Sequence, residues 1–130
     1  MMRCDAEWLG RTLAELKPEE LSPLLNLGAS TKHFRQVEQP YIDKLVFRPL
    51  EARGVRVIHS DLKAAEGVDL VGDVFDNADF ARLQAAKPRS VICTHMFEHA
   101  VNSLWMPIRP SRMGRAAPSY FPLQFNWRVL

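Results

Sequence analysis

Four short apolar runs, each followed by a glycine or an acidic residue, recur along this chain of 130 residues and constrain its fold more than any other feature. The runs are residues 24–27, 55–58, 68–71 and 90–94, and the residues that follow them are Gly28, Asp61, Asp73 and Glu98. Runs of this length read as buried strands, and the segments between them favour helix. This alternation predicts an α/β fold whose sheet is mainly parallel.

One helix is predicted before the first strand and another between the third and fourth strands. Residues 5–16 carry Trp8, Leu9, Leu13 and Leu16 at helical spacing, and Pro18 marks the end of the helix. Residues 78–86 follow Asp76 and Asn77, either of which can cap the helix, and its apolar side chains Phe80 and Leu83 are expected to face inward.

A longer helical segment is predicted over residues 34–53. Tyr41, Leu45 and Val46 supply its apolar stripe. Pro40 can start a segment, and Pro49 is expected to kink or restart the helix before Gly54 ends it.

The predicted architecture is an incomplete Rossmann-like fold, a mainly parallel sheet in the strand order 3-2-1-4 with helices on both faces. In this order the fourth strand, residues 90–94, becomes an edge of the sheet. An exposed apolar edge strand pairs readily with another chain, so self-association is expected unless the C-terminal tail covers it.

Length and composition allow one domain. The charge is uneven: residues 103–130 contain four arginines and no Lys, Asp or Glu, so this tail carries +4 and the remainder −2 of the total of +2. We therefore divide the chain into a half-domain, residues 1–102, and an Arg- and Pro-rich tail, residues 103–130. The tail aromatics show no periodicity with the arginines, so nucleic-acid binding is not expected.

No apolar run is long enough to cross a bilayer, and the N-terminus lacks the apolar stretch of a signal peptide. Cys93 lies in the fourth apolar run, where a buried structural thiol is the expected state. These features predict a cytoplasmic protein. His33 and His59 are expected to be surface or loop residues.

Three strand ends carry side chains suited to a nucleoside. The loop at Gly28 joins a strand to a helix, where backbone N–H groups can meet an anion, although a simple tight turn explains this segment equally well. Asp61 can accept hydrogen bonds from both ribose hydroxyls, and Asp73 can reach an adenine amino group. Two acids at successive strand ends argue against a chance arrangement of solvated loop residues.

Together, residues 25–30, 60–63, 67–73 and 91–99 resemble class I methyltransferases that use S-adenosylmethionine, of the type 11 kind. The resemblance covers roughly residues 20–102. It implies that the first loop packs against the methionine part of the cofactor, that Asp61 holds the ribose, that Asp73 contacts adenine and that Glu98 lies near the cofactor. The cofactor-binding residues that it implies are Asn26, Leu27, Gly28, Ala29, Ser30, Asp61, Leu62, Asp73, Val74, Thr94, His95 and Glu98.

The family pattern stops after the fourth strand. The first loop keeps one glycine where many members have two or three, and residues 103–130 lack the fifth strand and the hairpin expected in the family. The sequence thus predicts S-adenosylmethionine binding, with methyl transfer to an unknown acceptor if the chain is active. The alternative is a truncated, non-catalytic remnant or interaction module. Methyl transfer depends on alignment, so no catalytic base is assigned.

Two other chemistries are disfavoured. Residues 95–99 spell H-x-x-E-H, the inverted zinc-peptidase motif, but no His, Asp or Glu follows His99 to supply a third ligand, so no metal is expected. A dinucleotide-binding oxidoreductase fragment would need the G-x-G-x-x-G fingerprint, which the Gly28 loop lacks.

Overall fold

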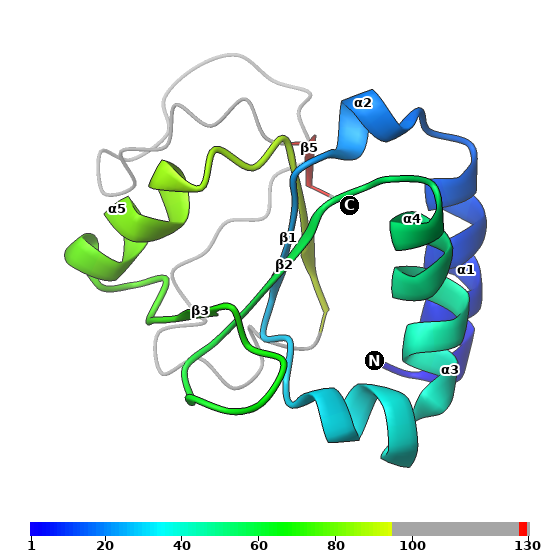
Figure 1. Ribbon diagram of the computed structural model, residues 1–130, viewed down its shortest axis with the longest axis horizontal. Helices are drawn as coiled ribbons and strands as arrows, with labels where there is room; N and C mark the ends of the chain where they lie inside the picture. The colour runs from blue at the N-terminus through cyan, green and yellow to red at the C-terminus, as the bar shows by residue number, and fades with distance from the viewer. Residues whose placement is uncertain (95–127, 130) are drawn as a thin grey trace, which may run out of the picture.

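The computed structural model describes residues 1–94 together with residues 128 and 129. The fold is α/β, with one sheet between two layers of helices (Figure 1). Helix α5 (Asn77–Ala85) covers one face of the sheet. Helices α1 (Arg3–Ala14), α3 (Pro40–Ile42) and α4 (Arg48–Ala52) cover the other. The predicted fold class, with helices on both faces, is confirmed.

Strand β1 lies at the centre of the sheet and is buried along its whole length. The first four strands are β1 (Leu24–Leu27), β2 (Val57–Asp61), β3 (Leu70–Val71) and β4 (Ser90–Cys93). All of them are parallel and follow the predicted order 3-2-1-4, with Leu24 opposite both Val57 and Ser90.

A fifth strand extends the sheet where an edge was predicted. Strand β5 (Arg128–Val129) runs parallel to β4, with its two residues opposite Ser90 and Val91. The prediction that β4 forms an edge is therefore wrong for the first half of this strand. Local sequence could not predict the pairing, because a two-residue strand has no periodicity and depends on a partner far away in the chain.

Alternate residues of the central strands build two separate cores. Leu24 of β1 and Ile92 of β4 face the helices of the α1 layer and join a cluster with Leu13, Phe47 and Leu50. The neighbouring residues point the other way, so that a second cluster under α5 contains Leu25, Leu27, Ile58, Leu83 and Val91. This alternation follows from the two-residue period of a strand.

Helix α1 starts and ends two residues earlier than predicted, and one of its apolar residues faces solvent. Ala6, Leu9 and Leu13 form the buried stripe, whereas the Trp8 residue is 58% exposed. A residue adjacent to Leu9 in sequence is turned about 100° around the helix axis, so Trp8 cannot share the face of Leu9 and Leu13. Trp8 therefore lies outside the buried stripe of the helix that its spacing helped to predict.

The predicted helix over residues 34–53 is interrupted. Two π-helical turns, η1 (Phe34–Glu38) and η2 (Asp43–Phe47), alternate with α3 and α4. Pro40 opens α3 as predicted, because proline lacks the N–H that would continue the preceding turn. Pro49 lies in the first turn of α4, where a missing N–H costs nothing.

The remaining elements differ from the predictions at their ends. Strand β2 begins two residues later than predicted and extends to Asp61, while β3 is confined to two residues. Helix α5 has the predicted cap: the Asp76 Oδ1 atom accepts hydrogen bonds of 3.0 Å from the N–H groups of Ala78 and Asp79. Its Leu83 is buried as predicted.

No helix in the described residues has the length and apolarity needed to cross a membrane.

Gly10 provides a test of the contact between α1 and η2. A Cβ atom at this position would overlap the backbone carbonyl of Leu45. Replacing an exposed helical glycine with alanine stabilises a protein by about 1 kcal/mol, but overpacking costs about 1–3 kcal/mol. We therefore expect Gly10→Ala to lower the free energy of unfolding by up to about 2 kcal/mol in urea titrations.

The control is Arg11→Ala on the exposed side of the same helix, expected to change the stability by about 0.5 kcal/mol or less. A Gly10→Ala protein more stable than the wild type would contradict the close packing of α1 on η2.

Candidate functional site

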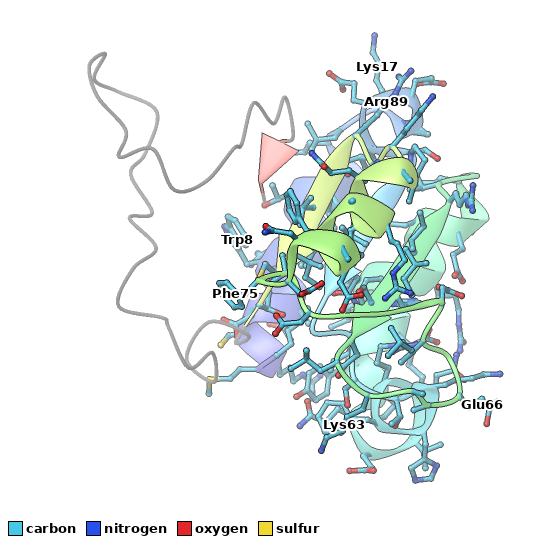
Figure 2. The ribbon with its side chains drawn as sticks, turned by 90° about the vertical axis from the view of Figure 1, so that its left-hand side faces the viewer. Trp8, Lys17, Lys63, Glu66, Phe75 and Arg89 are labelled. Atoms are coloured by element: carbon cyan, nitrogen blue, oxygen red, sulfur yellow. The ribbon has the colours of Figure 1, made fainter. Side chains whose placement is uncertain are left out.

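The carboxyl ends of β1, β2, β3 and β4 share one edge of the sheet, because the four strands are parallel neighbours. Figure 2 shows Lys63 and Glu66, from the loop after β2, at one end of the molecule, and Lys17 and Arg89 at the opposite end. Lys17 and Arg89 belong to segments that lead into the amino ends of β1 and β4. The predicted site residues of the first three strands thus lie at the same end of the sheet.

Asp61 ties the end of β2 to the loop after β1. Its Oδ2 atom accepts a hydrogen bond of 2.8 Å from the Ser30 N–H, and its Oδ1 atom accepts one of 3.3 Å from the Lys63 N–H. The Ala29 N–H continues the strand pairing by donating to the Ser60 carbonyl at 3.0 Å. Each carboxylate oxygen has two lone pairs, so Asp61 keeps capacity to accept further hydrogen bonds.

The loop after β1 contains two left-handed residues, Gly28 with a φ of 68° and Ser30 with a φ of 56°. Glycine adopts this conformation freely, whereas for serine it costs about 1 kcal/mol. The hydrogen bond from the Ser30 N–H to Asp61 offsets that cost. The loop therefore makes its second left-handed turn without a second glycine.

Arg35, which the sequence did not predict as a site residue, lies behind this loop with only 5% of its surface exposed. Its Nη1 atom donates to the carbonyls of Ala29 (2.8 Å) and Ser30 (2.6 Å), and its Nη2 atom donates to the carbonyl of Gly67 (2.8 Å). Burial lowers the pKa of Arg35 below its usual value, against the opposing effects of Asp69, Asp43 and Asp61. The side chain joins the loops that follow β1 and β2.

A signal for Arg35 existed in the sequence. It lies seven residues before Ile42 and eleven before Val46, which places it on the buried side of the predicted helix. Arginine is almost never fully buried unless it is paired, and its partners here are carbonyls that no sequence pattern marks.

His59 is a half-buried strand residue, so the expectation that it lies on the surface or in a loop is wrong. Its ring packs edge-on against Phe47 with centroids 4.9 Å apart. The Asn26 Nδ2 atom lies 3.1 Å from His59 Nδ1, which accepts this hydrogen bond only when the nitrogen is unprotonated. Burial, with a smaller contribution from Arg35, lowers the pKa of His59 to about 4. His59 is therefore neutral at neutral pH.

Asp73 follows β3 and is held by its own turn. Its Oδ1 atom accepts a hydrogen bond of 2.8 Å from the Phe75 N–H, and its N–H donates to Asp79 Oδ2 at 2.8 Å. That N–H and an ion pair with Arg82 lower the pKa of Asp79. The preceding Gly72 N–H donates to the Asp61 carbonyl at 3.0 Å, so the two predicted acids are linked through the backbone.

The other predicted residues fall into three groups. The side chains of Asn26 and Leu27 are buried within the sheet, and Val74 is half-buried under α5. Leu62 is 67% exposed, and Thr94 is half-buried directly after β4. His95 and Glu98 lie outside the described residues.

The H-x-x-E-H motif also lies outside the part of the chain that the structure describes. Within residues 1–94, no group of three His, Cys, Asp or Glu side chains could hold a metal ion. Cys93 is half-buried rather than fully buried as predicted. Its burial raises the pKa of the thiol to about 11, so little of the reactive thiolate forms at neutral pH.

Comparison with known proteins finds no family model, no curated protein and no solved structure that matches this chain. The methyltransferase resemblance therefore stays a prediction, and the geometry of the strand ends carries the functional proposal.

The low pKa of His59 predicts a specific loss of stability in acid. The unfolded chain binds a proton at this histidine below about pH 6.5, but the folded protein does so only near pH 4. The contribution of His59 to the free energy of unfolding should fall by up to about 3 kcal/mol as the pH decreases through this window. Urea unfolding at a series of pH values measures the effect.

His59→Gln should flatten the pH dependence between about pH 6.5 and pH 4, whereas His33→Gln, at an exposed position, should leave it unchanged. Equal pH profiles for the wild type and His59→Gln would refute the assignment of a buried, neutral His59.

Proposed function

We propose that this chain binds S-adenosylmethionine at the carboxyl edge of its sheet, as a methyltransferase-like domain. The observation that carries the proposal is the hydrogen bond between the Ser30 N–H and Asp61. It holds an acceptor carboxylate at the end of β2 directly beside the left-handed loop that ends β1. In open α/β sheets ligands bind beyond these strand ends.

The chemistry of the ligand matches this arrangement. A ribose offers two hydroxyl donors, and Asp61 presents two oxygens with spare lone pairs. An adenine amino group is also a donor, and Asp73 presents a second carboxylate one strand further along the sheet. Asp73 Oδ1 is engaged by its own turn, so the Oδ2 atom is the acceptor that we assign to adenine.

Cofactor binding and methyl transfer are separate parts of the proposal. Binding requires the ends of β1, β2 and β3, which the structure describes. Transfer also requires an acceptor, which stays unidentified, and we assign no catalytic base because the reaction depends on aligning the methyl group with its acceptor. We place the protein in the cytoplasm, where its two free cysteines, Cys4 and Cys93, would stay reduced.

Calorimetric titration tests the proposal. We expect the purified chain to bind S-adenosylmethionine and S-adenosylhomocysteine but not NAD. Asp61→Ala and Asp73→Ala should each weaken binding by about 5- to 150-fold, which corresponds to the roughly 1–3 kcal/mol of a hydrogen bond to a charged group.

The control for lost negative charge is Glu15→Ala, which lies between α1 and α2 and so precedes the amino end of β1. It should bind like the wild type. Thermal unfolding of each variant separates lost binding from lost folding, because Asp61 also holds the loop at Ser30. If neither methionine-derived nucleoside binds, the proposed function fails; unchanged affinity in both Asp variants would reject the assigned site.

A further inference from the structure

We infer that Arg35 is a positioning residue of this site, which orients the backbone N–H groups of Ser30 and Thr31 by holding the carbonyls on the opposite side of the same peptide planes. The inference rests on the proposed function, because the site that Arg35 positions is the proposed cofactor site. It goes further by assigning a role to a residue that, within the described part of the chain, forms no hydrogen bond or ion pair with Asp61 or Asp73.

The geometry of the peptide bond determines where the Ser30 and Thr31 N–H groups point. In a trans peptide the C=O and the following N–H point in opposite directions. The Ala29 carbonyl points to Arg35 Nη1, so the Ser30 N–H points away from the guanidinium, where it donates to Asp61. The Ser30 carbonyl points to the same nitrogen, so the Thr31 N–H is also directed away from Arg35.

The burial of Arg35 makes its hydrogen bonds to the loop carbonyls costly to break. Arg35 forms no ion pair with any carboxylate in the described residues. The carbonyls of Ala29, Ser30 and Gly67 accept its hydrogen bonds, and nearby acids such as Asp69 attract its charge without forming an ion pair with it. Leaving a buried charge unsatisfied costs more than leaving a neutral group, so these carbonyls are held firmly. The loop after β1 therefore cannot rotate its peptide planes while Arg35 stays in place.

The two terminal nitrogens of the guanidinium bond two different loops. One terminal nitrogen holds the loop after β1, and the other holds Gly67 in the turn before β3. A lysine ammonium is a single point charge at the end of its side chain and cannot span both loops in this way. Arg35→Lys thus keeps the charge and removes the bridge.

Arg53 offers a matched control. It also donates from both terminal nitrogens to backbone carbonyls, those of Leu13 in the last turn of α1 and of Leu16 just after the helix. It precedes the amino end of β2 and is therefore at the opposite end of the sheet from the proposed site. Arg53→Lys measures the general cost of losing an arginine fork to carbonyls.

The experiment combines titration with S-adenosylhomocysteine and amide NMR of the ligand-free protein. We expect Arg35→Lys to lower the affinity about tenfold or more and to shift the Ser30 and Thr31 amide resonances, with circular dichroism retained. Arg53→Lys should keep the affinity within about twofold and leave both resonances in place. A folded Arg35→Lys protein with wild-type affinity, or with unshifted Ser30 and Thr31 amides, overturns the inference.

A second variant covers the case in which Arg35→Lys does not fold. Gly67 has a left-handed φ of 79°, and a Cβ atom there would lie 2.5 Å from Lys32 Cβ and 2.9 Å from Arg35 Nη2. Gly67→Ala therefore displaces both the guanidinium and the neighbouring Lys32 without removing Arg35. It should produce the same amide shifts and weaker binding, and their absence would overturn the inference. If the wild type binds no S-adenosylhomocysteine, the proposed function fails, while the amide shifts still decide whether Arg35 orients the loop.

Discussion

The pairing of β1 with a parallel strand on each side is the constraint on which the rest of the structure depends. Leu24 lies opposite Val57 and Ser90, and this register sends Leu24 into the core under α1 while Leu25 enters the core under α5. A shift of one residue would exchange the two faces and bring the polar side chain of Asn26 into the α5 core. The same register sets Leu27 beside Ser60, so that the loop after β1 meets Asp61.

At the carboxyl edge, the two acids proposed to bind a ligand and the positioning residue Arg35 are already hydrogen-bonded to the backbone of the surrounding loops. Asp61 accepts from Ser30 and Lys63, Asp73 accepts from Phe75, and Arg35 donates to three carbonyls. Across the residues that the structure describes, every buried side-chain nitrogen or oxygen has a hydrogen-bond partner. A ligand would use the spare lone pairs of the carboxylates, which favours donors such as ribose hydroxyls and an amino group. Such an arrangement is organised before the ligand arrives, so binding costs little ordering of the loop.

Elements that depend on neighbouring residues were predicted more accurately than elements that depend on contacts between distant parts of the chain. The strands at residues 24–27 and 90–93 were predicted to within one residue, because each is a short run of mainly buried residues that follows a proline. The segment over residues 34–53 was predicted as helix with a possible start at Pro40 and a kink or restart at Pro49. Its alternating α and π turns were not predicted, because they depend on how Ile42, Val46 and Phe47 reach the core. Strand β5 was missed because its pairing with Ser90 and Val91 has no local signal.

The amino-acid sequence by itself determined the α/β class, the positions of the buried strands and the placement of Gly28, Asp61 and Asp73 at strand ends, since these follow from local periodicity and turn residues. Tertiary structure alone decided how those residues are held. The contacts of Arg35 with Gly67, of Asn26 with His59 and of Ser30 with Asp61 join residues more than thirty positions apart. Local propensity cannot encode such pairs, because each becomes favourable only after the parallel sheet has brought both partners out of water and into contact.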